Sequence, residues 1–231
     1  MIALFPEGFE EVERKDGSFE LAAYTDAAGE ERVWHVFGGA RSTDVADGWE
    51  DRWRAFHRPV RVGRLWVGPP WEAPPDDALV VVVDPGRAFG TGAHQTTQLC
   101  LQFLQDVEPG ALLDVGCGSG VLAIAGALLG FAPVVGVDIE GPSIEATREN
   151  AVRNGVTILA HLVSADAPLP TTDIAVANIS LEGIRSLDGR LDATTLITSG
   201  YLASERPKPA GFRHAEQRTL DGWASDLYVR A

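Results

Sequence analysis

Between residues 79 and 198 the chain alternates between short apolar segments, typical of buried strands, and longer segments with helical spacing. Expected strands cover residues 80–83, 111–115, 133–138, 158–163, 174–177 and 194–198, and expected helices cover 96–107, 121–129 and 142–154. Such alternation favours a parallel sheet with helices on both faces. Segments 212–217 and 223–229 flank the turn at Leu220-Asp221-Gly222 and predict an antiparallel hairpin at the sheet edge. We therefore predict an α/β fold with a mostly parallel sheet.

The 231 residues are enough for one large domain with a small companion. Residues 1–48 are expected to form a small α+β domain for substrate recognition, in which strands at 18–24 and 32–37 make a hairpin. Residues 49–77 are rich in Trp and Pro and are expected to be a connector. Residues 78–231 are expected to form the domain that carries the chemistry.

Composition narrows the class of function. The formal net charge is −14, which disfavours direct binding of nucleic-acid phosphates and favours a basic protein partner. With only two cysteines, neither a disulfide framework nor a cysteine-built zinc site is expected, and we predict no metal. We find no targeting segment and no apolar run of about 20 residues, so we expect no membrane association and a cytoplasmic location. The oligomeric state stays open.

The most informative motif is Asp114–Gly120 (DVGCGSG), which follows an expected strand and opens an expected helix. Gly116 and Gly118 would let a ligand approach the backbone without a Cβ in the way. The spacing is Gly-x-Gly-x-Gly rather than the Gly-x-Gly-x-x-Gly of dinucleotide enzymes, which disfavours a pyrophosphate and a dehydrogenase. Asp138 ends the next strand, where an acid accepts ribose hydroxyls. Together these features predict S-adenosylmethionine as cofactor, with Asp166 as a further candidate that would reach the adenine amino group.

A second motif precedes the helix at 96–107. Residues 84–97 (DPGRAFGTGAHQTT) contain more glycines and hydroxyls than a helix start needs. With the glycine loop and the segments 136–139 (GVDI) and 176–179 (VANI), this motif resembles the PrmA family, methyltransferases that modify large-subunit ribosomal protein eleven. The resemblance extends over about residues 49–231. It implies the Rossmann-like class I fold of S-adenosylmethionine-dependent methyltransferases, with a mostly parallel seven-stranded sheet.

The resemblance also implies a set of site residues. Thr97, Gly116, Asp138 and Asn178 match the family's cofactor contacts, and residues 89–92 match a loop that closes over the cofactor. Asn178 is expected to be catalytic, with its side-chain carbonyl aligning the substrate amine. A general base is not expected, and we interpret His94 as structural. The family usually has an apolar or aromatic residue where this chain has Ser180, so the substrate channel is expected to differ.

The predicted function is protein N-methylation, on lysine or α-amino groups of a large-subunit ribosomal protein. Three alternatives remain open. One is methylation of another protein or of a small amine. Another is methylation of a nucleobase or a glutamine amide, although the usual Asn-Pro-Pro-Tyr motif is replaced here by residues 178–181 (NISL). The last is a catalytically inactive module that binds the cofactor and serves in ribosome assembly.

Overall fold

The computed structural model of the chain describes residues 10–13, 19–22, 27–39, 58–84 and 92–231. It divides into two compact units, residues 1–53 and residues 54–231. The segment 49–77, which we expected to be a connector, includes two strands of the second unit, β3 (Val60–Val62) and β4 (Leu65–Gly68).

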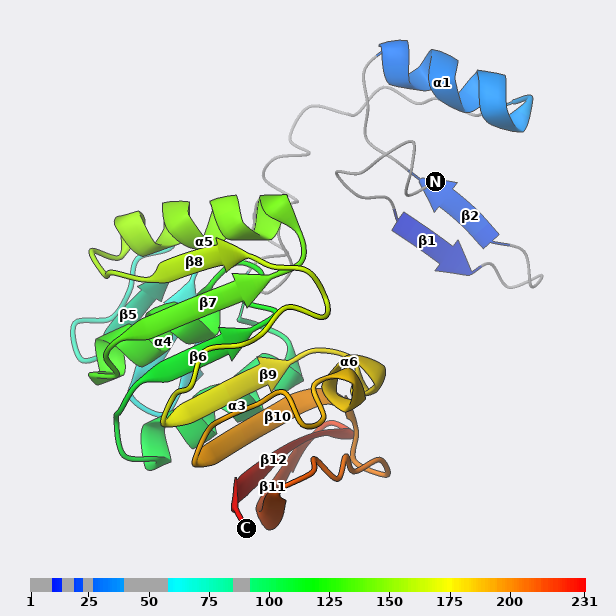
Figure 1. Ribbon diagram of the computed structural model, residues 1–231. Coiled ribbons are helices and arrows are strands. Elements are labelled where there is room, and N and C mark those ends of the chain that lie inside the picture. Colours follow the sequence, from blue (N-terminus) through cyan, green and yellow to red (C-terminus); the bar gives the residue numbers. More distant parts are fainter. Residues whose placement is uncertain (1–9, 14–18, 23–26, 40–57, 85–91) are drawn as a thin grey trace. The chain divides into compact units, whose positions relative to one another are not determined.

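The first unit contains an antiparallel strand pair and a helix (Figure 1). Strands β1 (Glu10–Glu13) and β2 (Phe19–Ala22) pair with each other, and helix α1 (Ala27–Phe37) follows. The strand predicted at 18–24 is confirmed by β2, but the strand predicted at 32–37 is wrong, because these residues end α1. An apolar alternation of six residues does not separate a strand from a helix. The preceding alanines and glutamates favour the helix.

The second unit contains the predicted seven-stranded sheet, in the order β11-β12-β10-β9-β6-β7-β8. Its members are β6 (Leu112–Val115), β7 (Val134–Asp138), β8 (Leu159–Leu162), β9 (Ile174–Asn178), β10 (Thr195–Leu202), β11 (Phe212–Leu220) and β12 (Trp223–Arg230). The five strands from β10 to β8 are parallel, whereas β12 pairs antiparallel with both β10 and β11. The predicted fold class and the predicted C-terminal hairpin are therefore confirmed.

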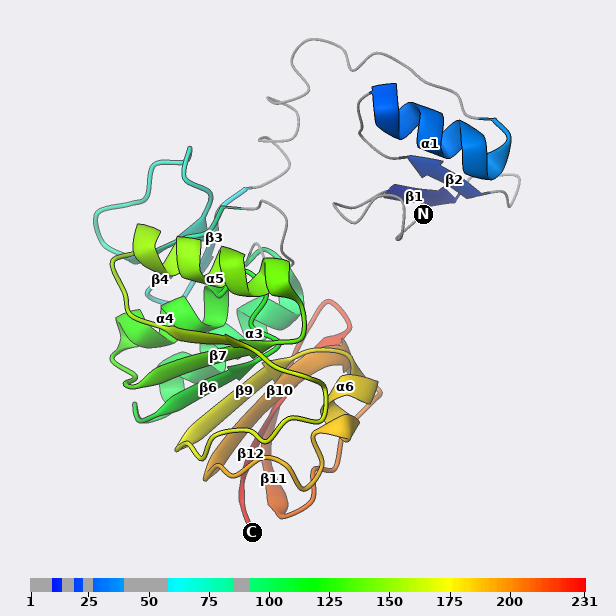
Figure 2. The same cartoon turned by 45° about the horizontal axis from the view of Figure 1, so that its top comes forward.

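Three helices cover one face of this sheet (Figure 2): α3 (Gln95–Asp106), α4 (Val121–Leu129) and α5 (Gly141–Arg153). The bounds of these helices lie within one residue of the predicted bounds, because residues typical of helix ends stand there in the sequence. Pro142 lies in the first turn of α5, and Gly130 ends α4 with a left-handed backbone. Apolar residues of α3 and α4 pack against alternate residues of the central strands to form the main core. No helix in the described part of the chain is long and apolar enough to cross a membrane.

The other face differs from the prediction. The described chain covers it with the short helix α6 (Leu181–Ser186) and with two irregular segments, 163–173 and 187–194, rather than with a layer of helices. Leu169, Leu187 and Leu191 from these segments pack against the central strands. The physical reason is length: the segment between β8 and β9 is only eleven residues long, close to the minimum for a crossover, and it is polar and proline-containing.

A smaller sheet lies beside α3 and α4. Strand β4 pairs antiparallel with β3 and parallel with β5 (Leu79–Val82). The strand predicted at 80–83 therefore exists, but it belongs to this three-stranded sheet. Asn154 at the end of α5 holds β5 with two hydrogen bonds, because its amide nitrogen donates to the Val82 carbonyl (2.7 Å) and its amide oxygen accepts from the Val82 N–H (2.8 Å).

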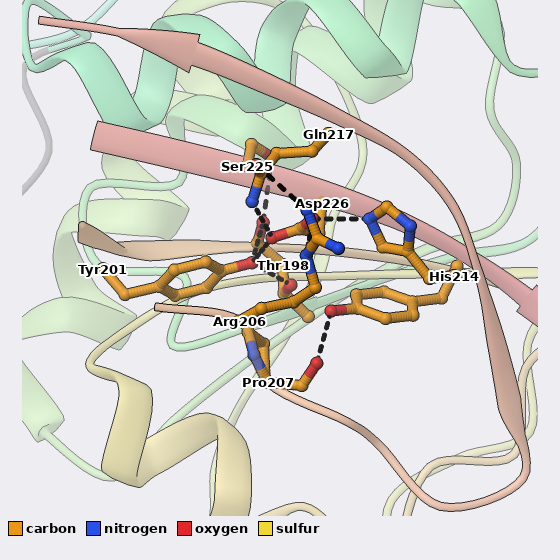
Figure 3. A network of polar contacts seen from close by, with 9 residues as sticks. Thr198, Tyr201, Arg206, Pro207, His214, Gln217, Ser225 and Asp226 are labelled. Atoms are coloured by element: carbon orange, nitrogen blue, oxygen red, sulfur yellow. Dashed lines mark hydrogen bonds and ion pairs between the residues drawn. The ribbon is translucent and has the colours of Figure 1, made fainter. Parts of the chain in front are cut away.

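The C-terminal hairpin is attached to β10 through a buried carboxylate (Figure 3). The Asp226 side chain is fully buried and accepts hydrogen bonds from the Tyr201 hydroxyl (2.7 Å) and the Gln217 amide (3.2 Å). Its other oxygen lies 2.7 Å from His214 Nε2. The side chains therefore join all three antiparallel strands, since Tyr201 is on β10, His214 and Gln217 are on β11, and Asp226 is on β12. Burial, together with Asp226, raises the pKa of Tyr201, which keeps the hydroxyl a donor.

Candidate functional site

A cavity of about 610 Å³ opens at the carboxyl ends of the parallel strands. This edge is where α/β sheets bind their ligands. The described residues that line the cavity come from the glycine loop, the ends of β7 and β9, the starts of α3, α5 and α6, the segment after β8 and the hairpin: His94, Thr96, Thr97, Asp114–Gly118, Val121, Leu122, Val137–Glu140, Ser143, Val163–Ala165, Leu169, Asn178–Ser180, Gly183, Ser186, Leu187, Arg190, Gly200 and Trp223.

The glycine loop lies between β6 and α4, and the carboxylate of Asp138 at the end of β7 accepts a hydrogen bond from it. One carboxylate oxygen of Asp138 accepts from the Gly118 N–H (3.0 Å), and the other accepts from the Glu140 N–H (3.0 Å). Gly116 has a φ of +73°, and a Cβ there would lie 2.4 Å from the Ile179 side chain. A side chain at this position would therefore be strained and would collide with the segment after β9.

Side chains of α5 donate hydrogen bonds to the backbone of the glycine loop. The Thr147 hydroxyl donates to the Gly118 carbonyl (2.9 Å), and the Asn150 amide donates to the Ser119 carbonyl (3.0 Å). Asn150 also accepts from the Asp84 N–H (3.2 Å), just before the segment 85–91. Both side chains are buried. The loop backbone is thus held by side chains rather than only by its own turns.

Asn178 ends β9 and contacts the start of α3. Its amide nitrogen donates to the Thr97 hydroxyl (3.2 Å), and both residues line the cavity. The N-cap of α3 is His94, whose Nδ1 accepts from the Thr96 N–H (3.3 Å). Thr97 lies in the first turn. The interpretation of His94 as structural is supported by this cap and by an edge-on contact with Trp223, with ring centroids 4.9 Å apart.

The segment that follows Asn178 is held against β10. The Ile179 N–H donates to the Ser199 carbonyl (3.1 Å), and a Cβ on Gly200 would lie 2.0 Å from the Ile179 carbonyl oxygen. Gly200 has a φ of +105°, so this close approach requires glycine. Ser180 then caps α6 by accepting from the Gly183 N–H (3.2 Å). Ser180 therefore has a structural role as well as a place on the cavity wall.

The cavity is acidic. Among the described residues that line it, Asp114, Asp138 and Glu140 are acidic, and Arg190 carries the one guanidinium. Burial raises the pKa of Asp114 to about 7, although its carboxylate accepts from the Ala123 N–H (3.1 Å) in the first turn of α4. Burial also raises the pKa of the Cys117 thiol to about 12, so this cysteine stays protonated at neutral pH. The site therefore favours a ligand with positive charge.

Five of the six predicted site residues come together here: Thr97, Gly116, Gly118, Asp138 and Asn178. Asp166 does not line this cavity. Its side chain is exposed and accepts from the Ser164 hydroxyl (2.8 Å), which lowers its pKa. The cavity wall after β8 is formed by residues 163–165 and Leu169 instead.

Trp223 and Arg190 are among the wall residues that sequence reasoning missed. Trp223 begins β12, and its place depends on the antiparallel insertion of that strand beside β10, which no local pattern reveals. Arg190 follows the short α6 in a turn with no recognisable motif. The predicted closing loop falls mostly on residues 85–91, which lie outside the described residues. Among the described residues, no cluster of three or more His, Cys, Asp or Glu side chains could hold a metal ion.

The strand order, the glycine loop after β6 and the acid at the end of β7 define a class I methyltransferase fold. Comparison with known proteins agrees: the model of the family described as "Ribosomal protein L11 methyltransferase (PrmA)" matches residues 13–225. The chain therefore belongs to the ribosomal protein L11 methyltransferase family.

Individual relatives give the extent of the likeness. A ribosomal protein L11 methyltransferase of Pseudomonas putida (strain W619) is 43% identical over 191 residues, which cover 76% of this chain and 65% of that protein. A protein of the same name from Aliivibrio fischeri (strain MJ11) is 42% identical, covering 75% and 62%. The chain thus spans somewhat less than two thirds of the length of these curated relatives. The crystal structure of the ribosomal protein L11 methylase from Lactobacillus delbrueckii subsp. bulgaricus matches with a TM-score of 0.66 at 33% identity, covering 75% of this chain and 99% of that one.

Proposed function

We propose that this chain is an S-adenosylmethionine-dependent N-methyltransferase whose substrate is ribosomal protein L11, modified on lysine or α-amino groups. The substrate is inferred from the names of the two curated relatives described above, which are ribosomal protein L11 methyltransferases. The observation that supports the chemistry best is the pairing of Asn178 with Thr97 on the wall of an acidic cavity at the carboxyl edge of the sheet.

The residues of the cavity fit the cofactor. The volume of about 610 Å³ lies within the range of cavities that hold small ligands. Asp138 would accept the ribose hydroxyls, and the backbone at Gly116 and Gly118 would lie against the amino-acid part. The carboxylates of Asp138 and Glu140, with the partly ionised Asp114, match the positive charges on the sulfonium and the ammonium group. When bound, S-adenosylmethionine supplies a methyl group on a positively charged sulfur, which an amine attacks by in-line displacement.

Asn178 would then orient the nucleophile. Because its amide nitrogen donates to Thr97, its carbonyl oxygen is directed away from that hydroxyl and can accept an N–H of the substrate amine. This fixes the direction of the nitrogen lone pair, and alignment of this kind contributes much of the rate in a displacement. A lysine ammonium must first lose a proton, since its ordinary pKa is about 10.4. The apolar residues around Asn178, such as Ile179 and Trp223, favour the neutral amine.

Transfer of tritium from methyl-labelled S-adenosylmethionine to purified L11 tests this proposal. We expect the full chain to label L11 and Asn178→Ala to reduce the turnover number by about 100-fold or more, as expected when a positioning hydrogen bond in the site is lost. Affinity for S-adenosylhomocysteine should change little in that variant. Gln102→Ala is the matched control, because it removes an amide from α3 at a position that does not line the cavity.

Two outcomes would contradict the proposal. Labelling at the wild-type rate by Asn178→Ala would remove Asn178 from the reaction. Tight binding of S-adenosylhomocysteine with no labelling of L11 would favour another amine substrate or a cofactor-binding module without catalysis. Incubating total ribosomal protein with the labelled cofactor separates these two possibilities, because only a chain that methylates another amine there leaves a labelled product.

A further inference from the structure

Arg190 joins the two irregular segments that cover the open face of the sheet. Its guanidinium donates to the carbonyl oxygens of Ala165 (2.5 Å) and Ala167 (2.6 Å), which lie after β8. It also donates to the carbonyl of Ser186 (3.4 Å), at the end of α6. All three acceptors are backbone groups, so this one side chain connects the segment after β8 with the segment after β9.

The geometry of these contacts requires an arginine. A guanidinium presents five N–H donors in a fixed planar fork, so it can reach several carbonyls at once. A lysine ammonium at the same place is a point donor on a flexible stem and would hold one of the two segments less firmly. The half-buried position of Arg190 strengthens hydrogen bonds from its charged group.

The segment that Arg190 holds is a wall of the cavity. Residues 163–165 and Leu169 line it, next to Asp138 at the end of β7. The beginning of the segment is fixed to β7, because the Val163 N–H donates to the Asp138 carbonyl (2.9 Å). Beyond that point no helix supports it in the described chain. Ala165, Leu169, Ser186 and Arg190 also line a second hollow, together with Asp166 and Pro168.

We propose that Arg190 is a positioning residue that fixes the adenine-binding wall of the cofactor site, and that it thereby sets the selectivity for adenine. This rests on the proposed function, in which Asp138 binds the ribose and the base lies beyond it, against residues 163–169. Asp166, the acid we expected to recognise the adenine amino group, is exposed and accepts from the Ser164 hydroxyl through one oxygen, and it does not line the cavity. In this proposal the base is recognised by backbone N–H and C=O groups of the wall. Backbone groups distinguish an amino from an oxo substituent only when they are held in place.

Hydrogen–deuterium exchange tests the positioning without any ligand. In the full chain, Arg190→Met should speed exchange of the amides in residues 163–169, while the amides of the core strands keep their wild-type protection. Arg185→Met is the matched control, because it removes the same charge from an exposed position on α6 outside the cavity. Unchanged exchange at 163–169 in Arg190→Met would overturn the proposed positioning role.

Calorimetry with two ligands tests the selectivity. S-adenosylhomocysteine and S-inosylhomocysteine differ only at one edge of the base, where the 6-amino group and the N1 acceptor of adenine are replaced by a 6-oxo group and an N1–H donor. We expect wild type and Arg185→Met to prefer the adenine ligand, and Arg190→Met to lose about tenfold in affinity for it, equivalent to about 1.4 kcal/mol. The inosine ligand should lose much less, so the preference falls. Arg190→Lys should lie between wild type and Arg190→Met, and it serves as the test if the methionine variant does not fold.

The outcomes separate the two proposals. Equal losses for both ligands, or no loss, would overturn the role of Arg190 in selectivity while leaving the proposed function intact. Failure of the wild-type chain to bind either ligand would overturn the proposed function and the adenine selectivity with it. Even then, the exchange measurement would still decide whether Arg190 fixes the wall.

Discussion

At the scale of single residues, Asp138 connects the glycine loop to the proposed ribose site. Its carboxylate already accepts two backbone N–H groups, and each oxygen can accept a further hydrogen bond. We expect Asp138→Ala to weaken S-adenosylhomocysteine binding by about 1.5–3 kcal/mol, a typical value for hydrogen bonds to a charged group. Calorimetry measures the change. Glu145→Ala, on the exposed side of α5, should bind like wild type, and an unchanged dissociation constant in Asp138→Ala would exclude Asp138 from the site.

The raised pKa of Asp114 predicts how the stability of the folded chain changes with pH. Burial raises its pKa in the folded chain to about 7, from an ordinary value of 3.8. Between these values the folded state keeps a proton that the unfolded state has released, so this residue makes stability fall as pH rises. The wild type should therefore lose stability relative to Asp114→Asn, on the order of 4 kcal/mol between about pH 4 and pH 8. Urea unfolding at several pH values tests this; a constant difference between the two proteins would contradict it.

A comparison of Asp138 with Asp166 shows what a sequence can reveal about a site. The glycine loop and Asp138 were predictable, because both follow directly from a strand whose end lies at the ligand-binding edge. Asp166 also follows a strand, but the Ser164 hydroxyl two residues earlier binds its carboxylate. Local hydrogen bonds of this kind compete with ligand binding and leave no pattern beyond a common serine.

At the scale of elements, periodicity predicted α3, α4 and α5 because each has a long apolar pattern and a marked end. It failed for α1, where the apolar alternation is short. It also could not reveal that the face opposite these helices is covered by irregular segments. The way this face is covered depends on which connections are too short to form a helix. It also depends on the hydrogen bonds of Arg190 to residues that are distant in sequence.

One buried carboxylate adds to the attachment of the C-terminal hairpin, whose strand β12 also pairs with β10 through its backbone. Asp226→Ala would remove the acceptor of the Gln217 amide, one of the acceptors of the Tyr201 hydroxyl and the ion pair with Arg206. We expect the free energy of unfolding to fall by about 3–5 kcal/mol, as when one partner of a buried polar pair is removed. Glu216→Ala, on the same hairpin, breaks only a largely exposed contact with Arg218 and should cost less than about 1 kcal/mol. Equal losses of stability in the two variants would contradict this view of the hairpin.

At the scale of the whole molecule, the net charge of −14 should act on the protein substrate more than on the cofactor. Ribosomal proteins that bind RNA are basic, so the chain's negative field would attract them over several ångströms. Raising the salt concentration from about 0.1 M to about 1 M shortens the Debye length from about 10 Å to about 3 Å. The Michaelis constant for L11 should then rise severalfold. Binding of S-adenosylhomocysteine should change less, because its contacts lie inside the cavity, where screening is weak. A parallel salt dependence of the two would show that charge acts at the cavity itself rather than across the surface.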